Sequence, residues 1–223
     1  RKKLIFDFDI KEFIKNNIME FTLWNHLNGS ITYMIYRIDT FVLSFFATVE
    51  QLAAYTVALT LSNYFFIIPQ IGEKVLKVGY SRIEANSEGD RKFQFYGTLV
   101  LTLISILQFA GFVLFGRVLI NFLFPNVNVQ LVYQLAAMII LGVTLLNLAR
   151  PVNAILIIRT SLKDLFKRVY LPAGIVSIFI YFAAAFIFGL YGVASGNILS
   201  YLFFGLLIIF YGKKKDVKTL NSA

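Results

Sequence analysis

The sequence predicts an all-α, polytopic membrane protein built as a bundle of six transmembrane helices. Of its 223 residues, 58% are hydrophobic and only 15% are charged. A soluble domain is nearer half apolar and about a quarter charged. The chain also contains six long apolar runs, each of which reaches the roughly 20 residues needed to cross a bilayer. Its 24 phenylalanines exceed what a soluble core of this size needs.

The six runs define the expected spans. They lie at about 18–46, 52–79, 93–115, 129–158, 169–188 and 191–211, within a transmembrane lobe of residues 18–212. Several are longer than the bilayer requires, which implies tilt or helical extension beyond it.

Three shorter segments are too polar or too short to span. Residues 1–17 place Ile10, Phe13 and Ile14 at helical spacing among charges, which predicts an amphipathic helix lying in the interface. Residues 116–126 predict a second short interfacial helix, ended by Pro125. Residues 213–223 form a basic tail, expected in the cytoplasm.

The distribution of Lys and Arg predicts the orientation. Eighteen of the 21 cations fall before the first run, at the end of the second run or in the loop after it, after the fourth run or after the sixth, while the alternate connections carry only Arg117. Because cytoplasmic loops are enriched in Lys and Arg, both termini are expected in the cytoplasm. This rule accounts for the net charge of +9 without a nucleic-acid partner.

Composition also narrows the chemistry. The chain has no cysteine and one histidine, which excludes disulfides, thiolate chemistry and His or Cys metal clusters. No paired carboxylates, nucleophile–base set or phosphate-binding glycine loop stands out. We therefore expect no enzyme and no cofactor. The chain begins with Arg1 rather than Met, from which we expect a piece of a longer protein.

Arg37 and Asp39 lie inside the first apolar run, where a charge costs roughly 2.5–3.5 kcal/mol on insertion scales. Two residues apart on a helix, they point about 200° apart and need separate partners. Arg37 either reaches the head groups or a structural partner, or it lines a cavity. Asp39 makes structural hydrogen bonds or ion pairs, or it couples transport to protons.

Arg150 is the other cation inside a run, and Pro151 follows it. Proline frees a carbonyl one turn back and tends to kink a helix. A kink beside Arg150, with Asn147 one turn before it, suits a polar pocket. The alternative is that Arg150 satisfies the freed carbonyl or reaches the cytoplasmic interface.

The first run also carries Asn25, His26 and Asn28. Asn25, Asn28 and Gly29 share one helix face, which predicts a polar stripe toward a cavity or, equally, hydrogen bonds to a neighbouring helix. His26 either makes hydrogen bonds or carries protons near neutral pH.

Two stretches resemble a known family. "RIDTFVLSFFATVEQLAAYTVALTLSNYFFIIPQIGEKVL" (37–76) and "FGLYGVASGNILSYLF" (188–203) are similar to the second half of polysaccharide flippases, the Wzx-like members of the multidrug/oligosaccharidyl-lipid/polysaccharide exporter superfamily. The matching residues are Ile38, Asp39, Leu43, Tyr55, Pro69, Gly192, Ala194, Ser200 and Tyr201. Ser44, Val78 and Gly79 depart from the family pattern.

The resemblance implies one lobe of a two-lobe transporter, with the amino-terminal six-helix lobe missing or replaced by a second copy. It implies a plasma (inner) membrane location and alternating access through a central cavity. The implied partners are membrane lipids and an oligosaccharide linked to polyprenyl pyrophosphate. In that setting Arg37 and Arg150 would contact the pyrophosphate, with Asn25, Asn28 and Asn147 in the cavity and Asp39, Pro151 and His26 in structural or coupling roles.

Two other functions remain open at this point. A cation-coupled multidrug exporter of the same superfamily needs acidic residues within its helices, and Asp39 is the candidate. A membrane assembly module that transports nothing would have a solid interior with no polar cleft.

Overall fold

The computed structural model describes residues 18–83 and 87–220, with side chains described as far as Lys214. The predicted amphipathic segment 1–17 and the end of the predicted tail, 221–223, lie outside these residues. Every regular element in the described part is helical. The elements are α2 (Met19–Leu43), α3 (Val49–Arg82), α4 (Glu88–Leu123), α5 (Val129–Asn147), α6 (Arg150–Arg159), α7 (Leu162–Leu165), the π-helical turn η2 (Phe166–Tyr170) and α8 (Leu171–Leu220).

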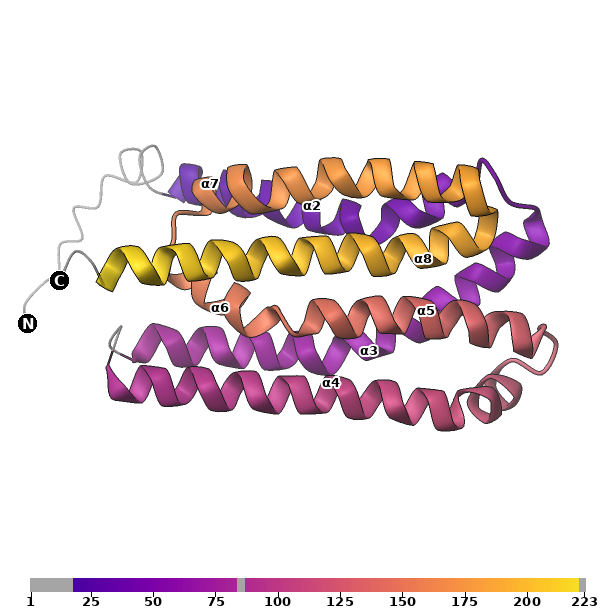
Figure 1. The fold of residues 1–223 in the computed structure, drawn as a ribbon, viewed down its shortest axis with the longest axis horizontal. Helices are drawn as coiled ribbons and strands as arrows, with labels where there is room; N and C mark the ends of the chain where they lie inside the picture. Colours follow the sequence, from indigo (N-terminus) through magenta and orange to yellow (C-terminus); the bar gives the residue numbers. More distant parts are fainter. Residues whose placement is uncertain (1–17, 84–86, 221–223) are drawn as a thin grey trace, which may run out of the picture.

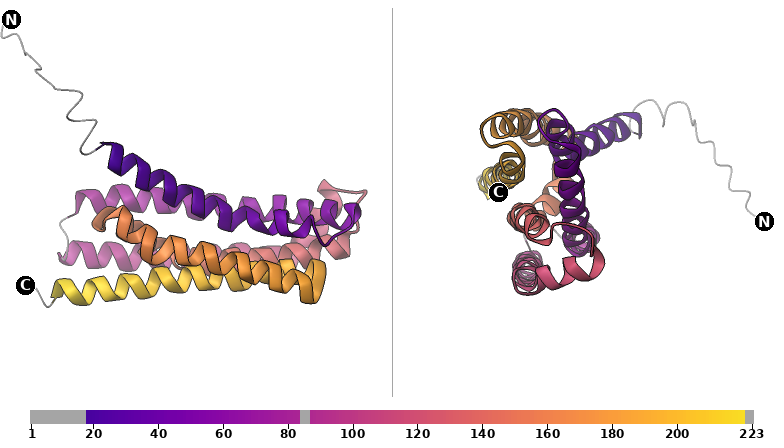
Figure 2. Two further views of the ribbon diagram at one scale, coloured as in Figure 1. Left: turned by 90° about the horizontal axis from the view of Figure 1, so that it is seen from above. Right: turned by 90° about the vertical axis from the view of Figure 1, so that its right-hand side faces the viewer.

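The long helices run along one common axis (Figure 1). α8 runs alongside α2, reverses, and returns between α2 and α5, while α3 and α4 form the opposite edge of the bundle. The start of α2 and the carboxyl end of α8 lie at the same end of the bundle. Figure 2 shows that the last turns of α4 swing away from the bundle axis.

The helix starts have local sequence causes. Thr48 and Gln51 form a capping box at the start of α3, in which each side chain accepts a hydrogen bond from the other residue's backbone N–H. Ser87 and Asn128 accept the same kind of bond at the starts of α4 and α5. These caps follow turns that the polar residues predict.

The fourth predicted span is divided in two. α5 ends at Asn147 and α6 begins at Arg150, with Pro151 in its first turn. Proline suits that position because its missing N–H would have no partner there in any helix. The interruption therefore comes just before the proline, and it puts Arg150 at a helix start within the bundle.

The sequence predicts a separate interfacial helix over 116–126, but the structure shows no break at residue 116. α4 continues without a break to Leu123, and Pro125 follows its end. No proline precedes Pro125 in this stretch to stop the helix earlier. The change of direction at the end of α4 is a bend rather than a new helix.

α8 is a helical hairpin whose reversal falls at Gly189. This residue has φ 55° and ψ −130°, and it is the described glycine with a positive φ. A side chain strains such a backbone conformation, which glycine adopts freely. The returning leg then packs tightly on α5, where a Cβ at Gly142 would lie 3.0 Å from the Asn197 carbonyl oxygen.

Replacing Gly189 with alanine should lower the free energy of unfolding by about 1–3 kcal/mol, the usual cost of a strained backbone conformation. Gly111 is the matched control, since it is helical and a Cβ there meets nothing within 4 Å. Gly111→Ala should be neutral or stabilise the protein by up to about 1 kcal/mol. Unfolding of the purified variants in mixed micelles measures both changes, and equal effects would contradict the assigned reversal.

Four helical segments in the described residues are long and apolar enough to cross a membrane. They are Val49–Arg82, Glu88–Leu123, Val129–Asn147 and Leu162–Lys214, the last of which contains the hairpin. α2, the first predicted span, is not among them, and it carries Glu20, Arg37 and Asp39 within its length. The structure thus establishes an all-helical chain with four candidate spans, and the count of six remains a prediction.

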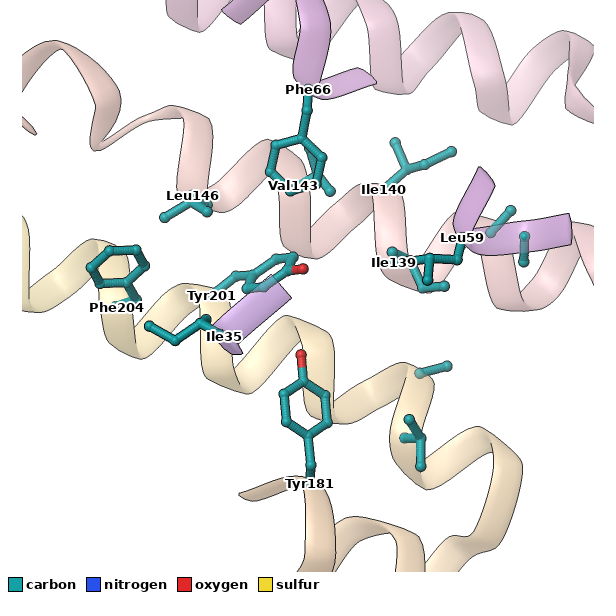
Figure 3. Packing of buried hydrophobic residues seen from close by; sticks show 14 of the residues in the cluster. Ile35, Leu59, Phe66, Ile139, Ile140, Val143, Leu146, Tyr181, Tyr201 and Phe204 are labelled. Atoms are coloured by element: carbon teal, nitrogen blue, oxygen red, sulfur yellow. The ribbon is translucent and has the colours of Figure 1, made fainter. Parts of the chain in front are cut away.

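The main hydrophobic core contains buried side chains from α2, α3, α5, α6 and α8. α4 contributes Phe112 and Ile120 to it. Figure 3 shows Ile35 of α2, Phe66 of α3, Val143 of α5 and Tyr201 of α8 converging. The Phe66 and Tyr201 rings meet edge to face with centroids 6.0 Å apart. Since lipid tails are as apolar as these side chains, such close packing rather than water exclusion holds helices together in a bilayer.

Candidate functional site

A cavity of about 440 Å³ lies between α2, α3, α6 and the returning leg of α8. Its size falls within the range of small-ligand pockets. Its polar and charged lining comes mainly from three elements: Asn25, Asn28 and Thr32 of α2, Gln70, Glu73, Lys74 and Lys77 of α3, and Arg150 and Asn153 of α6. The aromatic lining includes Tyr33, Tyr36, Tyr170 and Phe204.

Helical spacing explains why two of these helices present polar faces to the cavity. On α2 the lining residues recur every three or four positions from Asn25 to Tyr36, and on α3 they do so from Gln70 to Lys77. Residues at that spacing share one face of a helix. The opposite faces carry the apolar side chains that pack in the core or point outward.

Arg150 is the buried cation of this cavity, with 6% of its surface exposed. Its Nη1 donates to Oε2 of Glu73 at 2.7 Å, and its Nε donates to Oδ1 of Asn147 at 2.6 Å. The guanidinium carbon also lies 5.4 Å from the centre of the Phe66 ring. These contacts from α3 and α5 fix the orientation of the side chain.

Glu73 is the carboxylate on which this arrangement depends. Besides Arg150, it accepts from Asn153 Nδ2 at 3.0 Å, and Lys77 Nζ lies 2.9 Å from its Oε1. Asn153 in turn accepts a hydrogen bond from the Tyr170 hydroxyl at 2.9 Å. The network therefore links α3, α6 and η2 along one wall of the cavity.

Two cavity-lining residues carry a buried polar atom without a hydrogen-bond partner among the described residues: Nη2 of Arg150 and Oδ1 of Asn28. The guanidinium also interacts with the Tyr36 side chain, but no hydrogen bond from Nη2 itself is found among the described residues. Leaving a buried donor or acceptor unpaired costs about 1–3 kcal/mol. Native proteins rarely keep such groups unless water or a ligand satisfies them.

The cavity carries an excess of positive charge. Its described lining contains three cations, Lys74, Lys77 and Arg150, against one carboxylate, Glu73. Arginine binds phosphate oxygens with two parallel donors and stays charged at any accessible pH. The arrangement is suited to an anionic ligand.

The structure separates the residues that the sequence grouped as candidates. Asn25 and Asn28 line the same cavity as Arg150. Asn147 does not line it, but it accepts a hydrogen bond from Arg150 Nε. Pro151 starts the helix that carries Arg150. Arg37 and His26 are exposed and do not line the cavity, so the expected pairing of Arg37 with Arg150 at one ligand is not seen.

Asp39 belongs to a different, fully buried network. It accepts from the Tyr55 hydroxyl at 2.7 Å, and Asn197 Nδ2 lies 3.4 Å from the same oxygen. Asn197 also donates to Tyr55 at 2.8 Å and accepts from Tyr181 at 2.9 Å. Asp39 does not line the cavity, and these bonds connect α2, α3 and both legs of α8.

Glu73 is not among the candidate residues of the sequence analysis, and it is buried beside Arg150. Its partner, Arg150, lies 77 positions further along the chain, so no local pattern pairs the two residues. The available signal was the spacing of Gln70, Glu73 and Lys77 on one helix face. A carboxylate on such a face inside an apolar run indicates a buried polar site as clearly as Arg37 and Arg150 do.

A second, partly buried ion pair holds the other end of α6. Arg159 Nη1 and Nη2 donate to the two carboxylate oxygens of Asp90 at 2.8 and 2.7 Å. Paired bonds of this geometry are among the strongest that proteins make. α6 is therefore anchored at its first residue to α3 and at its last residue to α4.

Fold and site together define a class of protein: an all-helical chain, compatible with a multi-pass membrane protein, that surrounds a cationic cavity. Comparisons with protein-family models, with curated proteins and with solved structures found no match.

Proposed function

We propose that this chain is the carboxy-terminal lobe of a transporter that flips lipid-linked oligosaccharide across the plasma (inner) membrane by alternating access, for surface polysaccharide biosynthesis. The observation that carries the proposal is the buried Arg150, whose guanidinium is fixed by Glu73 and Asn147 while Nη2 has no hydrogen-bond partner among the described residues. A preorganised donor of this kind favours an anionic ligand.

The chemistry of the cargo fits this cavity. A lipid-linked sugar carries a pyrophosphate that cannot enter hydrocarbon unaided. Lys74, Lys77 and Arg150 supply positive charge, and the amides of Asn25 and Asn28 supply hydrogen bonds. The polyprenyl tail would stay among the membrane lipids while the head group occupies the cavity.

The membrane arrangement is part of the proposal. Six spans result if α2 crosses the bilayer and the two legs of α8 count separately; α2 has 25 residues, about 38 Å of helix, against a hydrocarbon core of about 30 Å. The excess of Lys and Arg at the end where α3 leads to α4 favours a cytoplasmic position for that end and for both termini. A second six-helix lobe, on another part of the chain or in a second copy, would complete the path.

The alternatives draw less support from the site. A cation-coupled exporter needs a carboxylate open to a coupling ion. Glu73, the acid among the described lining residues, is already bound by Arg150, Lys77 and Asn153. An assembly module would need no polar cavity.

Transport of a labelled polyprenyl-pyrophosphate sugar into membrane vesicles tests the proposal. Arg150→Gln should lower the initial rate at least about tenfold, since a hydrogen bond to a charged group contributes about 1.5–3 kcal/mol. Arg37→Gln removes the other arginine of the apolar runs, which is exposed outside the cavity, and should leave the rate within about twofold. Protein amount in the membrane is measured for each variant.

Equal losses in the two variants, or no loss in either, would contradict the assignment of head-group binding to Arg150. A rate that collapses when the proton or sodium gradient is dissipated, and that Arg150→Gln leaves unchanged, would favour the cation-coupled exporter.

A further inference from the structure

Two of the described residues that line the cavity each carry one buried polar atom without a hydrogen-bond partner, and the two atoms are opposite in kind. Nη2 of Arg150 is a donor, and Oδ1 of Asn28 is an acceptor. Both residues are more than nine-tenths buried, at 6% and 7% exposure, and both line the cavity. A ligand that satisfies both must accept at one point and donate at another.

Each of these residues is held in place by its remaining polar atoms. The Asn28 Nδ2 donates to the Leu162 carbonyl oxygen at 3.1 Å, which leaves Oδ1 as the unused atom of the amide. Arg150 is held by Glu73 and Asn147. The donor and the acceptor are therefore fixed on separate elements, α6 and α2, before any ligand arrives.

An ionised phosphate diester offers oxygens that accept, and it has no proton to donate. A sugar attached to it offers hydroxyl groups, and in acetamido sugars an amide N–H, which do donate. The wall beside Asn28 on α2 is aromatic, with Tyr33 and Tyr36 both lining the cavity. The lining therefore combines aromatic and apolar surface with placed hydrogen-bonding and charged groups, and both kinds of surface occur in specific small-ligand sites.

We infer that Asn28 is the specificity residue of this cavity: its Oδ1 accepts a hydrogen bond from the sugar adjoining the phosphate, while Arg150 Nη2 binds the phosphate oxygen. The inference rests on the proposed function and assigns the two halves of the head group to two residues. The site then prefers a glycosyl phosphate over a phosphate without its sugar.

Calorimetric binding to the purified full chain tests this with a matched set of probes, at a pH where all three are dianions without a proton on the phosphate: methyl phosphate, glucose 1-phosphate and N-acetylglucosamine 1-phosphate. At least one sugar phosphate should bind about five- to tenfold more tightly than methyl phosphate. Asn28→Ala should abolish that preference. Arg150→Gln should weaken all the probes that bind.

Asn28→Asp separates recognition from structure. It keeps an acceptor oxygen but loses the donor to Leu162, as alanine does, and its added charge weakens all phosphates together. The preference ratio should therefore survive in Asn28→Asp and vanish in Asn28→Ala. A ratio of one in the unmodified protein, or a ratio that survives Asn28→Ala, overturns the inference.

The two proposals fail in different ways. If methyl phosphate binds through Arg150 and the sugar phosphates bind no more tightly, the role assigned to Asn28 is wrong and the anion site remains. If no phosphate compound binds, both proposals fall.

Discussion

Replacing Glu73 with alanine should lower the free energy of unfolding by about 3–5 kcal/mol. The physical reason is that Arg150 would remain buried with its main counter-charge removed, and Asn153 and Lys77 would lose a common acceptor. The large expected effect comes from leaving the Arg150 charge buried and uncompensated. The net contribution of the intact ion pair to the free energy of unfolding is smaller than this cost. Unfolding of the purified protein in mixed micelles measures the change.

Two comparisons make this result specific. Glu50, in the first turn of the same helix, is exposed, and Glu50→Ala should cost less than about 1 kcal/mol. The double variant Glu73→Ala/Arg150→Met removes both charges and should recover most of the loss, because apolar replacement of a whole buried pair is often neutral. Losses that simply add would show that the two residues do not interact.

Replacing Asp39 with alanine should lower the free energy of unfolding by about 2–4 kcal/mol, through unpaired buried hydrogen-bonding groups and a small cavity. The Tyr55 hydroxyl would lose its acceptor at 2.7 Å, and the backbone N–H of Thr40 would lose its bond to Oδ1. The buried network that joins α2, α3 and α8 would then be incomplete. Denaturant unfolding followed by near-ultraviolet absorbance of the tyrosines measures the change.

Asp39→Asn is the matched variant, because an amide of the same shape still offers an oxygen to Tyr55. It should lose less than half of what alanine loses. Neither variant should alter phosphate affinity per folded molecule, since Asp39 lies outside the cavity lining. A loss of phosphate binding in Asp39→Asn with stability intact would instead indicate a coupling role.

The apolar runs predicted helices, and four helices of the described residues are long and apolar enough to cross a membrane. The run 129–158 predicted one helix with a kink, and the structure divides it just before Pro151, at the residue type that local rules identify. The hairpin at Gly189 lies between the predicted runs 169–188 and 191–211, at a residue that adopts a positive φ freely. Where a single residue or turn decides the structure, the sequence therefore predicted its position.

The candidate site was harder to predict because it depends on which helix faces meet. Arg37 and Arg150 look alike in sequence, as single cations in apolar runs, yet Arg37 is exposed and Arg150 is buried. Glu73 is the clearest omission. Its role depends on Arg150, on a helix that neither composition nor spacing places beside α3.

The most direct test of the central claim, a water-filled cationic cavity beside Arg150, uses the absence of native cysteine. Gly29 lines the cavity and Gly111 lies on α4, and a Cβ at either position meets nothing within 4 Å. With a charged thiol reagent applied to the protein in membranes, Gly29→Cys should react and pyrophosphate should slow that reaction at least about threefold, while Gly111→Cys should stay unreactive. An inert Gly29→Cys, or a reaction that pyrophosphate leaves unchanged, would contradict the account.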